Sequence, residues 1–334
     1  MSATRTLGQG SCLTFGVSLG GPFIYGIPEP AWFYSAVEEI EDLGYDAVWV
    51  SDHIVTPDPI QDSLILLAAF AARTRRILLG TGVFLLALRH PTLAAKSLSI
   101  LDLLSEGRVI LGVGVGGEFP KEFEACGVST RERGPRTNEA LDVIRQLWRE
   151  EHVTHRGRFF SFEDVSLKPP PAQQGGPPVW IGGRTEAALR RAVEQGDGWI
   201  SYLVTPERFR RSLESLGELA RKNGKNLENF STSHLHFLFV SDSLEKARKA
   251  AVDNLTRTYH QPFDPLVDKY CALGPPEACE ENIWRYYEAG VRHIVLRPTC
   301  PTEEFLPQLR RFAREVIPKL KMKASRLSKR SQKA

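Results

Sequence analysis

The chain has 334 residues, of which 42% are hydrophobic and 25% are charged, and this composition excludes a disordered chain, a collagen and a coiled-coil rod. Its length suits two medium-sized domains or one large α/β barrel. The net charge of +3 comes from the C-terminal end, because seven basic residues and no acidic residue follow from position 319 on, so the rest of the chain is acidic by four charges.

The ends of the chain and its cysteines indicate the cellular compartment. Residues 1–12 are predicted to be a flexible N-terminus, and the basic segment 319–334 a disordered tail, with a nucleic-acid-binding arm as the alternative. No secretory signal and no apolar run of about 20 residues is present, so we expect no membrane association. Five scattered cysteines form no CxxC pair, which favours a reducing cytoplasm.

Short apolar segments alternate with helical segments along residues 13–318, the predicted domain. The expected strands are 13–19, 47–51, 77–83, 108–113, 179–182, 198–201, 233–240 and 293–296. The expected helices are 32–43, 63–73, 91–104, 137–151, 185–195, 206–222, 244–259, 277–289 and 303–320. An irregular insertion is predicted over 152–178, because its run of three prolines fits neither a helix nor a central strand.

The eight predicted strands are almost continuously apolar, as burial on both faces requires. Eight βα units in one chain predict a (β/α)8 TIM barrel, with a doubly wound sheet as the alternative. In a TIM barrel the functional residues lie at the C-terminal ends of the strands, so the residues after each strand are the candidates for a site.

The second strand ends at Ser51, Asp52 and His53. An aspartate and a histidine at a strand end supply a carboxylate and a group that titrates near neutral pH to one cavity. The structural alternative is that Asp52 caps a turn and that His53 is solvated. We select His53 as a candidate catalytic residue.

Glycines follow the third and fourth strands, in GTGV (80–83) and GVGVGGE (112–118). The GxGxxG spacing in the second motif is not a dinucleotide fingerprint, because no apolar strand with a terminal acid follows. Gly114 and Gly116 are instead expected to leave room for a flat ligand above the barrel, whereas the third-strand glycines suggest close approach of a ligand, a strained turn or a bulge. Glu118 is a candidate general acid or a solvated loop residue.

The fifth strand leads through Ile181, Gly182, Gly183, Arg184 and Thr185 into a helix. Backbone N–H groups at a helix N-terminus bind anions, so this turn predicts a phosphate site, and the alternative is an ordinary turn with Thr185 as N-cap.

The seventh strand carries His234 and His236, which share one face. They suggest a metal-dependent hydrolase only if further ligands join them, so no metal is predicted, and the histidines are expected at most to line the cavity.

Three segments, YDAVWVSDH (45–53), residues 77–128 and PVWIGGRTEAALRRAVEQGDGWI (178–200), resemble the bacterial luciferase-like oxidoreductases. That superfamily includes monooxygenases that use FMN and enzymes that use the deazaflavin coenzyme F-420 (F420). The resemblance is dense over residues 13–200 and thinner over 230–315.

The resemblance implies roles for individual residues. It places Asp52 near the cofactor ring and His53 at the face where hydride is transferred. It implies a non-proline cis peptide bond at Gly82–Val83, behind the ring. The strand-five glycines would hold the cofactor phosphate. A catalytic Glu follows the strand-four glycines in some deazaflavin members, and Glu118 stands one position later than that pattern.

The sequence therefore predicts an oxidoreductase that uses F420 for hydride transfer to or from a small organic substrate. The alternative is a monooxygenase that uses reduced FMN and O₂, served by a separate flavin reductase. A homodimer is expected from the resemblance, and a cofactor-free barrel with a nucleic-acid-binding tail is a further alternative. Loops after strands one, two and seven, including 20–30, and the insertion are expected to select the substrate.

Overall fold

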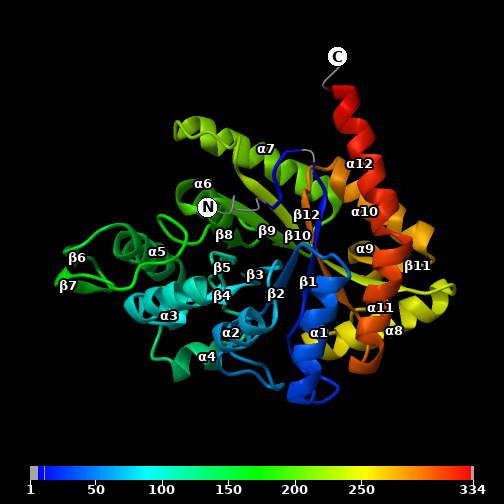
Figure 1. Cartoon of the computed structure of the whole chain (residues 1–334), viewed down its shortest axis with the longest axis horizontal. Coiled ribbons are helices and arrows are strands. Elements are labelled where there is room, and N and C mark those ends of the chain that lie inside the picture. The colour runs from blue at the N-terminus through cyan, green and yellow to red at the C-terminus, as the bar shows by residue number, and fades with distance from the viewer. Residues whose placement is uncertain (1–6, 11, 332–334) are drawn as a thin grey trace.

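Eight parallel strands form a closed barrel in the computed structural model, which describes residues 7–10 and 12–331 (Figure 1). Hydrogen bonds between the last strand and the first close the barrel. The barrel strands are β1 (Thr14–Ser18), β2 (Ala47–Val50), β3 (Leu78–Thr81), β5 (Val109–Gly114), β8 (Val179–Gly182), β9 (Gly198–Tyr202), β10 (Ser231–Val240) and β12 (His293–Pro298). The predicted TIM-barrel fold is confirmed.

Helices surround the barrel, and most of them begin at residues that the sequence marks as helix starts (Figure 1). The Asp62 carboxylate accepts the amides of Leu64 and Ile65 at the start of α2. The helices are α1 (Pro30–Asp42), α2 (Ser63–Arg73), α3 (Pro91–Leu104), α4 (Pro120–Ala125), α5 (Arg133–Arg149), α6 (Glu186–Gln195), α7 (Pro206–Lys222), α8 (Leu244–Tyr259), α9 (Val267–Tyr270), α10 (Pro276–Glu288), α11 (Thr302–Glu315) and α12 (Ile317–Ser331).

Two tryptophans fill the barrel interior. Trp49 and Trp180 are buried with their rings 5.2 Å apart, and the Trp49 indole donates to Nε2 of the buried His293 at 2.9 Å. A Cβ on Gly80 would lie 2.3 Å from Trp49, and one on Gly198 2.8 Å from Trp180. These glycines therefore make room for the two large rings, and the barrel is a packed core below its mouth.

Two short strands of the large sheet were not predicted. The strand β4 (Phe84–Leu85) pairs with β5 just after β3, and leads into the 3₁₀ turn η1 (Leu86–Leu88). The strand β11 (Cys271–Gly274) pairs with β10 in the segment between the helices predicted at 244–259 and 277–289.

The insertion is more regular than predicted. Strands β6 (Val153–Arg156) and β7 (Ser161–Val165) form an antiparallel hairpin at one edge of the molecule (Figure 1). The carboxylate of Glu139 on α5 accepts the amides of Arg158, Phe159 and Phe160 at its turn. The hairpin was missed because it lies beside the proline run, while its own residues carry little apolar pattern.

The C-terminal segment also differs from the prediction. The helix predicted at 303–320 ends at Glu315, and α12 continues to Ser331 instead of a disordered tail. Leu320 and Ala324 are buried, and Lys319 pairs with Glu277 on α10 at 3.0 Å. Spacing of small and apolar residues at i and i+4 gives this basic helix a face that packs on the domain. Residues 332–334 of the predicted tail lie outside the described residues.

Residues at the N-terminal end contact the barrel bottom. Of the predicted flexible segment 1–12, residues 1–6 and 11 lie outside the described residues. Leu7 is buried, and its carbonyl accepts the Ser231 hydroxyl at 2.7 Å. Over the described ranges 7–10 and 12–331, we find no helix with the length and apolar character that a membrane span requires.

Candidate active site

Asp52 lies at the C-terminal end of β2 and is fully engaged by protein donors. Its carboxylate forms a bidentate ion pair with Arg89, whose Nη1 and Nη2 donate to the two carboxylate oxygens at 2.7 and 2.9 Å. It also accepts the Leu85 amide at 3.0 Å and the Ser63 hydroxyl at 2.9 Å. A carboxylate has about four acceptor positions, so Asp52 holds the segment after β3 and α2 in place and has no position left for a cofactor.

His53, the next residue, is paired with a buried glutamate that the sequence analysis did not select. The His53 Nδ1 lies 3.2 Å from Oε2 of Glu122 on α4, and the Ile54 amide donates to the same oxygen at 2.6 Å. The Glu122 side chain is 0% exposed, whereas that of His53 is 16% exposed. The partly exposed imidazole is therefore held from behind by a buried carboxylate.

Hydrogen bonding keeps Glu122 ionised. Burial raises its pKa, but bonds from His53 and the Ile54 amide lower it by more, so the net pKa is below the ordinary value. An ionised Glu122 accepts a hydrogen bond from the Nδ1–H group of His53, which leaves Nε2 of a neutral His53 as an acceptor. The Phe119 ring packs edge-on at 5.2 Å and limits the ring's rotation.

The peptide bond Gly82–Val83 is cis, as the resemblance implied. Val83 lies across two glycines of neighbouring strands, because a Cβ on Gly114 would come within 2.3 Å of its side chain and one on Gly182 within 2.6 Å. Gly114 was predicted to leave room for a flat ligand, and Gly182 to hold the cofactor phosphate. The structure shows instead that they admit Val83, whose side chain forms that part of the mouth.

Gly116 and Glu118 follow β5 in a turn. Gly116 has a φ of +60°, and a Cβ there would lie 3.2 Å from Leu85, so its glycine serves the backbone turn. Glu118 is exposed and accepts the Tyr202 hydroxyl at 3.0 Å. It does not contact His53 by any hydrogen bond or ion pair among the described residues, so Glu122 and not Glu118 forms the acid–imidazole pair.

The turn after β8 is only partly the predicted anion site. The Gly183 amide donates to the Ile200 carbonyl at 3.1 Å, so it is used within the barrel. The Thr185 hydroxyl caps α6 by accepting the Ala188 amide, and Arg184 lies over the Tyr202 ring at 5.2 Å. Ile181 is buried in the core between barrel and helices rather than at the mouth.

Both histidines of β10 are structural. His234 bonds the Ser201 hydroxyl at 2.7 Å and stacks on Tyr286, while His236 bonds Asn282 at 2.8 Å. Burial lowers both pKa values, that of His236 to about 4, so both rings are neutral near pH 7. Within residues 7–10 and 12–331 no group of three or more His, Cys, Asp or Glu side chains could hold a metal ion.

The sequence matches the model of a family described as luciferase-like monooxygenase over residues 26–293. The chain belongs to this family. The match covers β2 to the start of β12, and so includes the His53–Glu122 pair, the Gly82–Val83 bond and the β8 turn. The fold and the predicted family are thereby both confirmed.

Curated proteins similar to this chain are named as dehydrogenases and reductases, and two of the three described here are named as F420-dependent. The chain is 29% identical over 317 residues to an F420-dependent glucose-6-phosphate dehydrogenase of Microbacterium testaceum, covering 84% of this chain and 90% of that one. A dehydrogenase of the same name from Kribbella flavida is 30% identical, with 84% and 91% covered. A 5,10-methylenetetrahydromethanopterin reductase of Archaeoglobus fulgidus is 28% identical, with 85% and 94% covered.

Solved structures confirm the barrel fold. An F420-dependent secondary alcohol dehydrogenase in complex with an F420–acetone adduct superposes with a TM-score of 0.79 at 23% identity, covering 92% of this chain and 99% of that one. The FMN-bound oxygenating constituent of 3,6-diketocamphane monooxygenase from Pseudomonas putida superposes with a TM-score of 0.77 at 19% identity, again covering 92% and 99%. At these identities the likeness establishes the fold alone.

Proposed function

We propose that this chain is an F420-dependent oxidoreductase that exchanges a hydride with a small organic substrate. The observation that carries the proposal is the His53–Glu122 pair at the barrel mouth, in a chain whose curated relatives are named as F420-dependent dehydrogenases. An imidazole held by a buried carboxylate is suited to proton transfer, which must accompany the interconversion of an alcohol and a carbonyl.

The proton chemistry follows from the pair's geometry. His53 takes the proton of a substrate hydroxyl at Nε2, and Glu122 stabilises the imidazolium that forms because its carboxylate accepts from Nδ1. In the reverse direction the imidazolium returns the proton to a carbonyl oxygen. Asp52 acts as a positioning residue through Arg89 and the Leu85 amide. F420, when bound, supplies the hydride chemistry.

The described residues fit such a cofactor at the mouth. Val83 is partly exposed above Gly114 and Gly182, and gives an apolar surface for a flat ring. The N-terminus of α6 presents the positive end of a helix dipole beside Arg184, which suits a phosphate. The carboxylate of Glu186, in the first turn of α6, would repel an anion bound there. The exposed Arg208 places a second positive charge nearby, because its guanidinium donates to the Arg184 carbonyl. We propose that Arg184 and this helix start hold the cofactor phosphate.

An anaerobic assay with purified protein tests the function. F420 is offered with simple secondary alcohols and with glucose 6-phosphate, and reduction is followed by the loss of the oxidised cofactor's absorbance. Turnover that is lost in His53→Ala supports the proposal. In a separate aerobic assay, transfer of an oxygen atom from O₂ to the substrate with reduced FMN, together with no turnover of F420, would establish the monooxygenase alternative and would overturn the proposal.

Location and assembly complete the proposal. We propose a cytoplasmic homodimer that acts on a small-molecule substrate, and no reductase partner is required if F420 is the cofactor. Size-exclusion chromatography with light scattering measures the assembly directly, and a monomeric mass at assay concentration would contradict the dimer.

A further inference from the structure

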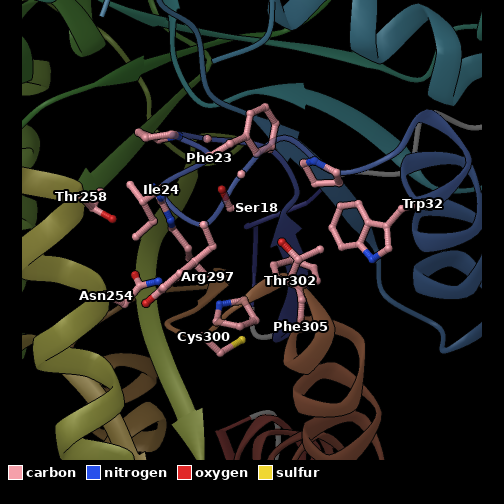
Figure 2. Close-up of a pocket in the computed structure, with 17 residues that line it drawn as sticks. Ser18, Phe23, Ile24, Trp32, Asn254, Thr258, Arg297, Cys300, Thr302 and Phe305 are labelled. Carbon is pink, nitrogen blue, oxygen red and sulfur yellow. The ribbon is translucent and has the colours of Figure 1, made fainter. Parts of the chain in front are cut away.

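A pocket opens at the mouth beside β1 and β12 (Figure 2). It contains none of the catalytic or cofactor-binding residues predicted from the sequence, but part of the loop 20–30, which was expected to select the substrate, lines it. It holds about 580 Å³ of empty space, part of it open to solvent. Its walls are the loop from Gly20 to Pro28, the α8 face with Asn254 and Thr258, and the ends of β1 and β12.

Arg297 is the single charged residue among those that line this pocket. It stands near the end of β12, and Figure 2 shows its side chain beside Ile24 and Asn254. Its guanidinium forms no hydrogen bond or ion pair with another residue within 7–10 and 12–331. A Cβ on Gly21 would lie 3.0 Å from its guanidinium, so this glycine lets the loop pass close to the charge.

The surroundings of Arg297 leave its charge uncompensated. Burial lowers its pKa, and the Tyr259 hydroxyl offsets this only in part. The Thr258 hydroxyl oxygen is buried and has no hydrogen-bond partner among the described residues. Arg297 is half-buried, and even partial burial of an unpaired cation costs folding free energy. A guanidinium with five free donors in the same pocket as an unsatisfied hydroxyl is the arrangement of a binding site for an acceptor.

The pocket is mechanically connected to the loop that carries His53. The Ser51 hydroxyl at the end of β2 donates to the Gly20 carbonyl at 3.3 Å, and the Phe23 amide donates to the Pro59 carbonyl at 2.9 Å. These bonds fix the loop over the pocket against the β2–α2 loop. A substrate seated in the pocket therefore lies next to the loop that holds the proposed base.

We propose that Arg297 and Thr258 form a subsite for an oxyanion, a carboxylate or a phosphate, on the substrate. The guanidinium fork matches both groups by paired hydrogen bonds, and the apolar walls of Ile24, Trp32 and Phe305 accept the carbon skeleton. This subsite would make the substrate of the proposed function an anionic compound. Anion binding at Arg297 does not depend on the proposed function, but the identification of that anion as the substrate does.

Calorimetric titration of the cofactor-free protein tests the subsite, with inorganic phosphate and acetate as separate probes. We expect Arg297→Met to lower the affinity for the more tightly bound of the two anions about tenfold or more, because a hydrogen bond to a charged group is lost. Arg257→Met is the matched control, since Arg257 is exposed on α8 and lies over the Tyr25 ring at the pocket edge. The affinity of the Arg257→Met variant for the same anion should stay within about twofold of the wild-type value.

Thermal unfolding provides a second readout, because replacing an arginine with a purely structural role would lower the melting temperature. Arg297→Met should melt at a higher temperature than the wild type without anion, and phosphate should raise the melting temperature of the wild type alone. Arg297→Lys keeps the charge without the planar fork, and it serves if the methionine variant does not fold; its binding should weaken several-fold.

The outcomes separate the subsite from the proposed function. Loss of anion binding in Arg297→Met supports the subsite even if the F420 assay is negative. Equal losses in the Arg297 and Arg257 variants, or no binding of either probe by the wild type, would overturn it even if F420 turnover is found. If phosphate binds more tightly than acetate, the substrate is a phosphate ester; the reverse order indicates a carboxylate.

Discussion

Two parts of the barrel mouth, at the ends of β2 and β12, differ in whether their charged side chains have partners within the protein. At the β2 corner, Asp52 is saturated by Arg89 and neighbouring donors, and His53 is held by the buried Glu122. At the β12 corner, Arg297 lines an open pocket with no ion-pair partner among the described residues.

The difference separates preorganisation from recognition. Charges that must keep one geometry throughout a reaction are fixed by protein partners, as His53 is by Glu122. A charge that must meet a ligand is left unpaired, at a cost in folding stability. We therefore expect substitutions at the β2 corner to lower turnover or stability, while Arg297 substitutions change ligand affinity.

His53→Ala should have the largest effect. Turnover should fall about 10²–10⁴-fold, the usual contribution of a proton-transferring side chain, with F420 affinity within a few-fold of the wild type. Steady-state kinetics and a fluorescence titration measure the two quantities. A loss of only a few-fold in turnover would show that His53 moves no proton in the reaction.

Asp52→Asn should lower the free energy of unfolding by about 3 kcal/mol, because it leaves Arg89, whose side chain is only 16% exposed, without a full countercharge. Asp62→Asn is the matched control, since Asp62 also contacts Arg89, at 3.2 Å, but its side chain is 39% exposed. That change should cost less than about 1 kcal/mol. Urea unfolding measures both, and equal losses would contradict the structural role of Asp52.

Glu122→Gln should lower turnover about 10–100-fold, because the bond that stabilises the imidazolium weakens. It also has a signature in stability. The lowered pKa of Glu122 means that the ionised group stabilises the fold above its ordinary pKa of about 4.5 and that this contribution fades as pH falls through the lower folded value. The unfolding free energies of wild type and variant should therefore differ at pH 7 and converge as the pH falls below the lowered pKa of folded Glu122. A constant difference at all pH values would refute the ionised pair.

Glu118→Gln should have the smallest effect, less than about threefold on turnover, since its bond to Tyr202 is exposed and exposed pairs contribute about 0–1 kcal/mol. Steady-state kinetics decide the point. A drop comparable to that of Glu122→Gln would return Glu118 to the role that the sequence suggested for it.

The sequence predicted the barrel because its strands are locally marked by apolar runs that end in glycine or polar residues. It predicted His53 for the same reason, since a strand-end histidine is visible in the local pattern. Glu122 was missed because it lies 69 positions further along, on a short helix, and only the fold brings its carboxylate to the imidazole. Its one local signal was an acid in the first turn of a helix behind Pro120.

The glycines show a second limit of sequence reasoning. Gly114 and Gly182 are required because of Val83, a residue on a neighbouring segment. The need for space was predicted at Gly114, but a ligand was expected to fill it, and Gly182 was predicted as part of a phosphate site. The basic end of the chain was likewise judged by its charge, although Leu320 and Ala324 are spaced to pack one helical face. Arg297 gave no signal at all, because a missing partner is visible only in three dimensions.

The most direct test of the account is an equilibrium titration of the purified wild-type protein with F420 and, separately, with FMN. The account predicts saturable binding of F420 with a clearly lower dissociation constant than that of FMN, and weaker F420 binding in Arg184→Gln. Tight binding of FMN with none of F420, or binding of neither, would contradict it.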